Sequence, residues 1–173
     1  MLIKDFFNIL IKQKYYMKIR LADENDVNGI KKLIDKNFDE IIAEYHSQTV
    51  VDKFKNYNSI ESLKAQLRWK TVYVACSKDL VAATGAFANF GTEENPKYSV
   101  SNFYVLPDLH KKGIGTEIMK ILIAKAMEKS AKTLHVPSTR NAVPFYEKCG
   151  FAVDDIQPET EDEITWMTMR IKY

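Results

Sequence analysis

The stretch from Phe103 to Thr116 reads FYVLPDLHKKGIGT. Its first half is apolar up to Pro107, and an amphipathic segment follows from Glu117 to Lys129, which predicts a strand, a tight glycine turn and a helix. The first N–H groups of a helix lack partners within the helix, and the positive end of the helix dipole lies beside them. Gly113 and Gly115 let a phosphate approach these groups closely. The turn therefore predicts binding of a phosphorylated cofactor.

Two common nucleotide-binding loops do not fit this turn. A P-loop ends in Gly-Lys-Ser/Thr, whereas Gly115 is followed by Thr116 and Glu117. A dinucleotide fingerprint needs a third glycine three residues after the second, and Ile118 occupies that position. The turn is a phosphate loop of another kind or, in the plainer alternative, a basic surface turn that caps a helix.

Two strings of the sequence resemble motifs of one enzyme family, the GNAT acetyltransferases. The string from Phe103 to Gly115 resembles the family's motif A, in which Gln/Arg-x-x-Gly-x-Gly/Ala follows a strand. The string from Asn141 to Phe151, NAVPFYEKCGF, resembles motif B, Ala-x-x-x-Tyr-x-x-x-Gly-Phe. Both stand in family order and at family spacing, and the resemblance covers roughly the span from Lys18 to Tyr173.

The resemblance implies an α/β fold with a single domain, residues 17–173, in which helices flank a mixed and mostly antiparallel central sheet. The residue patterns agree with it, since alternating apolar runs predict strands and 3.6-residue periodicity predicts helices. Strands are predicted at 18–21, 71–76, 80–89, 99–105, 133–136, 151–156 and 164–172. Helices are predicted from N-cap candidates at 23–26 through Phe38, as two pieces within 40–67, and at 117–129.

Residues 1–16 precede the region of family resemblance. Ile3, Phe6, Phe7 and Leu10 recur at helical spacing, which predicts an extra N-terminal amphipathic helix. Packing on the domain, dimerisation and contact with a membrane surface are the functions open to such a helix, and packing is the simplest of them. Met17 is a candidate for an alternative start of translation.

Composition excludes several classes of protein. The 173 residues are 46% hydrophobic and carry a formal net charge of +2, which suits one buried core and demands no nucleic acid. No apolar stretch reaches the length of a membrane span. Cys76 and Cys149 form neither a disulfide framework nor a metal-ligand spacing. We expect a metal-free protein of the reducing cytoplasm.

The resemblance implies acetyl-CoA as a cosubstrate. The turn amides would hold its pyrophosphate, and the strand through Phe103 and Val105 would pair with the pantetheine arm, with the Val105 N–H bonded to the thioester oxygen. Tyr146 matches the family tyrosine that protonates the departing thiolate, and a pKa near 10 makes it a competent donor. The expected cofactor-binding residues are Phe103, Val105, His110, Lys111, Lys112, Gly113, Ile114, Gly115, Thr116, Asn141, Phe145 and Tyr146.

The sequence departs from the family pattern at two places near the cofactor. His110 replaces the usual Gln or Arg, which affects one side-chain contact and leaves the backbone amides unchanged. Thr139 stands where the family often has Asn, and Asn141 follows two residues later. Which of these two side chains touches the cofactor stays open.

A general base is harder to assign. Many relatives carry a carboxylate on the strand before the phosphate loop, and residues 99–105 contain none. The candidates elsewhere are Glu44, His46, Glu93 and Glu94. A histidine titrates near neutral pH, so His46 is the preferred catalytic base.

The activity implied by the resemblance is transfer of an acetyl group to a primary amine of a small molecule or peptide, by direct attack in a ternary complex. Tyr45, His46 and Phe54 are candidates for lining the acceptor pocket. Acidic residues within 154–163 favour a cationic acceptor, unless they form a solvated loop. The alternatives are a catalytically silent acyl-CoA-binding or interaction module and a membrane-associated regulator that uses residues 1–16. The chain also allows a homodimer.

Overall fold

The computed structural model describes residues 17–78, 80–157 and 163–173. The predicted helix within residues 1–16 lies outside these ranges. In chain order, with η for a 3-10 helix, the elements are β1 (Lys18–Leu21), η1 (Glu24–Asp26), α2 (Val27–Glu40), η2 (Ile42–Glu44), α3 (Gln48–Tyr57), α4 (Ile60–Leu67), β2 (Thr71–Ser77), β3 (Leu80–Asn89), β4 (Tyr98–Val105), η3 (Pro107–Leu109), α5 (Ile114–Glu128), β5 (Thr133–Ser138), η4 (Arg140–Ala142), α6 (Val143–Lys148), β6 (Ala152–Val153) and β7 (Thr165–Arg170).

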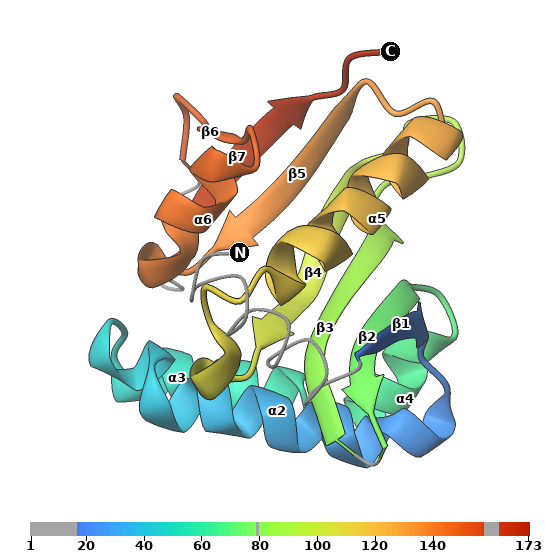
Figure 1. The fold of residues 1–173 in the computed structure, drawn as a ribbon. Coiled ribbons are helices and arrows are strands. Elements are labelled where there is room, and N and C mark those ends of the chain that lie inside the picture. The colour runs from blue at the N-terminus through green and yellow to red at the C-terminus, as the bar shows by residue number, and fades with distance from the viewer. Residues whose placement is uncertain (1–16, 79, 158–162) are drawn as a thin grey trace, which may run out of the picture.

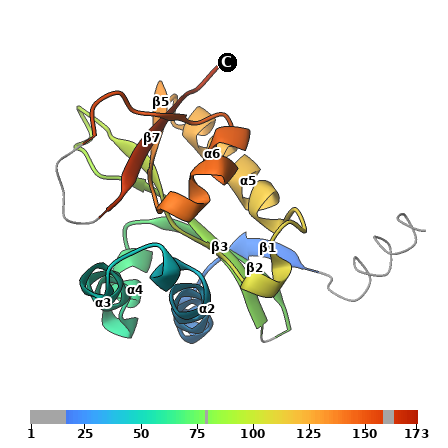
Figure 2. The same cartoon turned by 90° about the vertical axis from the view of Figure 1, so that its left-hand side faces the viewer.

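The strands of the described residues form one seven-stranded sheet in the order β1-β2-β3-β4-β5-β7-β6 (Figure 1). β4 and β5 are parallel, and all other neighbours are antiparallel. Helices α2, α3 and α4 lie on one side of the sheet, and α5 and α6 lie on the other (Figure 2). The predicted α/β fold, with a mixed and mostly antiparallel sheet flanked by helices, is confirmed.

Two apolar cores hold the helices against the sheet. On one face α2 buries Ile34 and Phe38, four residues apart on the same stripe of the helix, against β2 and β3. On the other face α5 buries Ile118 and Leu122 at the same spacing. All four side chains are at most 1% exposed, and burial of each contributes about 2 kcal/mol. The amphipathic pattern of each helix therefore decides which face of the sheet it covers.

The predicted strand at 151–156 is wrong in its length, because β6 ends at Val153. The side chain of Gln157 explains the early end of the strand. Its Oε1 accepts the Trp166 N–H at 2.7 Å, and its Nε2 donates to the Trp166 carbonyl at 2.9 Å. A side-chain amide thus pairs with the backbone of β7 where a longer β6 would have done so.

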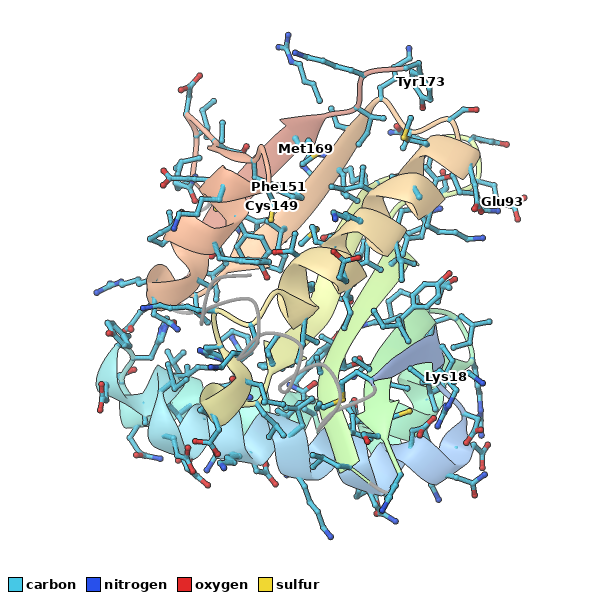
Figure 3. The ribbon with its side chains drawn as sticks, in the orientation of Figure 1. Lys18, Glu93, Cys149, Phe151, Met169 and Tyr173 are labelled. Carbon is cyan, nitrogen blue, oxygen red and sulfur yellow. The ribbon has the colours of Figure 1, made fainter. Side chains whose placement is uncertain are left out.

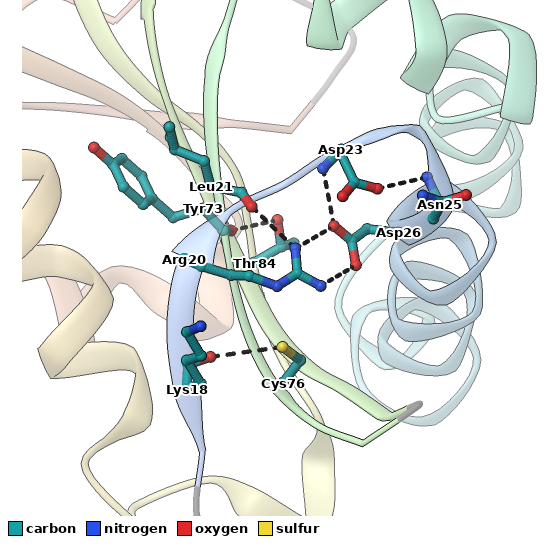
Figure 4. A network of polar contacts seen from close by, with 9 residues as sticks. All are labelled: Lys18, Arg20, Leu21, Asp23, Asn25, Asp26, Tyr73, Cys76 and Thr84. Carbon is teal, nitrogen blue, oxygen red and sulfur yellow. Dashed lines mark hydrogen bonds and ion pairs between the residues drawn. The ribbon is translucent and has the colours of Figure 1, made fainter.

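Arg20 ties the edge strand β1 to the start of α2 (Figure 4). Its Nη1 and Nη2 donate to the two carboxylate oxygens of Asp26 at 2.6 and 2.8 Å. Asp26 also accepts the Asp23 N–H at 2.9 Å, and the Asp23 side chain accepts the N–H of Asn25. Together these bonds lower the pKa of the buried Asp26 carboxyl, and the hydrogen bond from Arg20 is the main cause.

Asp26→Asn should lower the free energy of unfolding by about 2 kcal/mol near neutral pH, because it removes a charge-assisted pair. The folded-state pKa of Asp26 is depressed, so its contribution is present above the unfolded value of about 3.9 and is lost as pH falls through the folded value. Urea denaturation at a series of pH values should show the two proteins converging in acid. Asp35→Asn is the control, since it removes a surface pair with Lys31. A difference that does not change with pH would contradict the assignment.

Candidate active site

β4 contains a β-bulge at Asn102, which interrupts its regular alternation and is called the break below. Asn102 and Phe103 lie opposite the single residue Gly85 of β3, and Asn102 has a φ of 45°. The break shifts the alternation of side chains along the strand. Val100 and Phe103 both pack in the core under α5, whereas Tyr104 packs in the core under α2. Regular alternation from Val100 would turn residues 102 and 104 toward α5. In β4, Phe103 and Val105 face that side instead.

Beyond this break β4 and β5 separate, and the opening between them is called the split below. Their parallel pairing consists of one register position, Ser99 with His135. Figure 1 shows the two strands diverging toward their C-terminal ends. The backbone of β4 on the side toward β5 is consequently open to a ligand along residues 103–105.

The backbone of Val105 points into this split. Val105 lies opposite Ala83, and the N–H of the next residue, Leu106, bonds to the carbonyl of Ala82 at 2.8 Å. Val105 is thus in a non-hydrogen-bonded pair, so its own N–H and C=O point away from β3. The His110 Nε2 donates to the Val105 carbonyl at 2.9 Å, which fixes the end of the strand and leaves the N–H directed into the split.

The glycine turn joins β4 to α5. Gly113 is the N-cap of α5 with a φ of 87°, and no side chain of the described residues caps this helix. A Cβ at Gly113 would meet nothing within 4 Å, so the conformation and not the space requires glycine here. A Cβ at Gly115 would lie 3.3 Å from Cγ2 of Val105, so a side chain would press on β4. The N–H groups of Ile114, Gly115 and Thr116 form the first helical turn, where they have no partner within the helix.

Tyr146 lies on α6 across the split from β4. It is 4% exposed, and its ring packs on Phe103, Phe145 and Phe151 with centroids 5.3 to 5.9 Å apart. Burial raises the pKa of the Tyr146 phenol well above its usual value of about 10. The phenol is therefore protonated at neutral pH.

The end of α6 holds Tyr146 in place through the Gly-Phe pair of motif B. Gly150 has a φ of 97°, its N–H bonds to Glu147, and the N–H of Phe151 bonds to the Tyr146 carbonyl at 3.0 Å. This left-handed helix end turns Phe151 back into the core, next to Met169 of β7 (Figure 3). Glycine is needed here because other residues reach this φ only with strain.

These elements enclose a cavity of about 1270 Å³. The Val105 N–H points into the split that opens on this cavity. The Asn141 Oδ1 is buried and has no hydrogen-bond partner among the described residues. Both Thr139 and Asn141 line the cavity, whereas Lys112 does not. The other expected cofactor-binding residues in its wall are Phe103, Val105, His110, Lys111, Gly113, Ile114, Gly115, Thr116, Phe145 and Tyr146.

The four candidate bases do not line this cavity. The side chain of His46 is fully buried, with its Nδ1 3.3 Å from a carboxylate oxygen of Glu163, and burial lowers the pKa of His46. Figure 3 places Glu93 toward the end of the molecule where α5 ends, away from the glycine turn. Of the predicted pocket residues, Phe54 lines the cavity, but Tyr45 and His46 do not. The role of His46 as a base stays a prediction that this geometry does not support.

Sequence reasoning missed the part of the wall that comes from α2, the end of α3 and β7. These side chains belong to no recognised motif. Helical periodicity predicts only that the apolar residues of α2 lie in the core. Among the acidic residues expected at the acceptor entrance, Asp154 lines the cavity, while Asp155 and Glu163 do not. The missed wall residues include Asn37, Phe38, Tyr57, Asn58, Phe90, Asn102 and Trp166.

The described part of the chain contains no helix long and apolar enough to cross a membrane. Within the same residues no group of three or more His, Cys, Asp or Glu side chains is placed to hold a metal ion.

Residues 41–173 match the sequence model of the acetyltransferase (GNAT) domain. The chain therefore belongs to the GNAT acetyltransferase family. No curated protein sequence matches it.

Solved structures of low sequence identity share the fold. The PaiA N-acetyltransferase of Thermoplasma acidophilum, in complex with coenzyme A, has 15% identity and a TM-score of 0.75 over 89% of this chain and 98% of its own. An N-acetyltransferase of Staphylococcus aureus Mu50 has 18% identity and a TM-score of 0.66, over 90% and 99%. A predicted acetyltransferase of Clostridium acetobutylicum, solved with acetyl-CoA, has 22% identity and a TM-score of 0.63, over 83% and 95%.

Proposed function

We propose that this protein is an N-acetyltransferase that moves the acetyl group of acetyl-CoA to a primary amine of a small molecule or peptide. The cavity carries this proposal, because it joins the uncapped start of α5 to Tyr146 through the split between β4 and β5. Related folds solved with coenzyme A and acetyl-CoA support it. We assign catalysis to residues 17–173, treat residues 1–16 as an extension, and place the enzyme in the cytoplasm.

The residues around the glycine turn fit a phosphorylated cosubstrate. The N–H groups of Ile114, Gly115 and Thr116 would bind phosphate oxygens, with the positive end of the α5 dipole and the Lys111 charge beside them. Asn141 lies in the cavity wall with its side-chain oxygen buried and unpaired, so a rotation of its amide would present that oxygen to a donor on the ligand. The open backbone of residues 103–105 would pair with an amide-bearing arm.

The chemistry follows from two groups of the cavity wall. Acetyl-CoA supplies an activated thioester. The Val105 N–H would stabilise the negative charge that develops on the thioester oxygen when the amine attacks. The Tyr146 hydroxyl would donate a hydrogen bond to the departing sulfur, and the proton lost by the attacking nitrogen completes the thiol, so the products are an amide and free CoA. The raised pKa of Tyr146 makes its phenol a weaker acid than tyrosine in water, so the hydroxyl serves as a hydrogen-bond donor and the amine supplies the proton.

The experiment that tests the function is release of free CoA from acetyl-CoA with a panel of amines, set against a control without amine. Polyamines, aminoglycosides, amino acids and peptides with a lysine or a free N-terminus cover the acceptor classes. Release with one class supports the proposal and names the acceptor. Acetyl-CoA binding without release from any class would instead favour the silent acyl-CoA-binding module, which the lack of a carboxylate on 99–105 already favours.

Tyr146→Phe should lower kcat by about 100-fold while acetyl-CoA affinity changes by less than about twofold, because the variant loses the hydroxyl and keeps the buried ring. Steady-state kinetics and calorimetric titration measure the two quantities. Tyr98→Phe is the matched control, since Tyr98 stacks on Phe87 and does not line the cavity. Unchanged kcat in the Tyr146 variant would remove this residue from the chemistry.

Gly113→Val should weaken acetyl-CoA binding by about 100-fold or more, because a β-branched residue resists a φ of 87° and would turn the first N–H groups of α5 away. Gly113→Asn should keep more affinity, since asparagine tolerates this conformation best among non-glycine residues. Calorimetric titration compares the two variants. Equal, near-native affinity for both would contradict the phosphate loop.

A further inference from the structure

Lys70 is a buried lysine whose ammonium has no carboxylate partner among the described residues. It lies in the connection between α4 and β2 and is 5% exposed. Its Nζ donates to the side-chain oxygens of Gln66 and Asn102, each at 2.8 Å. Burial lowers the pKa of Lys70 to about 8, so the group is mostly charged at neutral pH. A buried charge is costly unless the groups around it compensate for the water it has lost.

Three aromatic rings surround the Lys70 ammonium. The Nζ lies 5.5 Å from the ring centroid of Tyr57, 5.0 Å from that of Trp69 and 5.5 Å from that of Phe90. Cation–π attraction to these faces offsets part of the cost of removing the charge from water. The ammonium is therefore held at a fixed place beside Asn102.

The side chain of Asn102 is fully engaged in this network. Its oxygen accepts from Lys70 and from the Ser101 hydroxyl at 3.2 Å, and its nitrogen donates to the Asn58 oxygen at 3.0 Å. Asn58 in turn donates to the Phe54 carbonyl at 2.9 Å. These amides line the cavity but bond to one another, so their polar groups hold the wall in shape and are not directed at a ligand.

Asn102 is also the residue that breaks β4, at a φ that non-glycine residues rarely adopt. A shift of one residue in a strand turns every later side chain to the other face of the sheet. Without the break, regular alternation from Val100 would turn Phe103 and Val105 toward α2 and away from Tyr146. The conformation of Asn102 thus determines whether the second half of β4 faces α6.

We propose that Lys70 is a positioning residue that holds Asn102 in its left-handed conformation and thereby aligns residues 103–105 for the cosubstrate. This inference rests on the proposed function, because it concerns how that site binds acetyl-CoA. Lys70 acts through Asn102 and does not touch the reacting atoms. A network of five side chains holds a conformation that a glycine in the strand would adopt without support.

The test is acetyl-CoA affinity, measured by calorimetric titration, which needs no acceptor amine. Lys70→Met should bind about tenfold more weakly, because Asn102 loses a bond that stabilises its left-handed conformation and that conformation becomes less populated. The double variant Lys70→Met with Asn102→Gly should recover to within about threefold of wild type, because glycine adopts this φ without support. Lys64→Met, at an exposed position on α4, is the control and should bind normally.

A second pair of variants keeps Lys70 and tests the conformation of Asn102 even if Lys70→Met does not fold. Asn102→Gly should bind acetyl-CoA more tightly than Asn102→Ala by about tenfold, since only alanine resists the positive φ. Equal affinities in this pair, or a double variant no better than Lys70→Met, would overturn the positioning role. Failure of the wild-type protein to bind acetyl-CoA would instead reject the proposed function, so the two failures are distinguishable.

Discussion

The left-handed conformation of Asn102 in the middle of β4 is the constraint on which the rest of the site depends. It allows one strand to pack Val100 and Phe103 on the same side of the sheet, although three positions separate them. The single register position between β4 and β5 precedes the break, and the split follows it. One residue conformation therefore accounts for both the direction of the side chains and the opening beside them.

The end of β4 is held from three directions, and each contact comes from a different element. His110 of the glycine turn donates to the Val105 carbonyl, and Gly115 of α5 packs closely on the Val105 side chain. The ring of Phe145 in α6 lies tilted beside the ring of Phe103, with their centroids 5.4 Å apart. At this end of β4 the Val105 N–H is left facing the split. Backbone groups have no rotamers to lose, so a site built on them is ordered before a ligand arrives.

The sequence predicted the parts of this structure that local patterns determine. Alternation of apolar and polar residues predicted the strands. Two short motifs predicted the glycine turn and the helix of Tyr146, because each contains a glycine at a position whose positive φ requires one. The break at Asn102 left no such signal, since its conformation depends on Lys70, 32 positions away. The early end of β6 depends on a side-chain bond of Gln157. The sequence predicted Phe54 of α3 in the cavity wall, but the place of Tyr57 at the end of α3 follows from tertiary packing, which no local pattern encodes.

The lengths of the two outer strands have a consequence for self-association. β1 spans four residues and β6 spans two, so the described sheet ends on both sides in short edges. Exposed strand edges are the places where a second chain adds by backbone pairing, and short edges offer few bonds to it. Over the described residues, copies of this protein gain little by extending each other's sheet, which protects a seven-stranded protein from growing into fibrous aggregates.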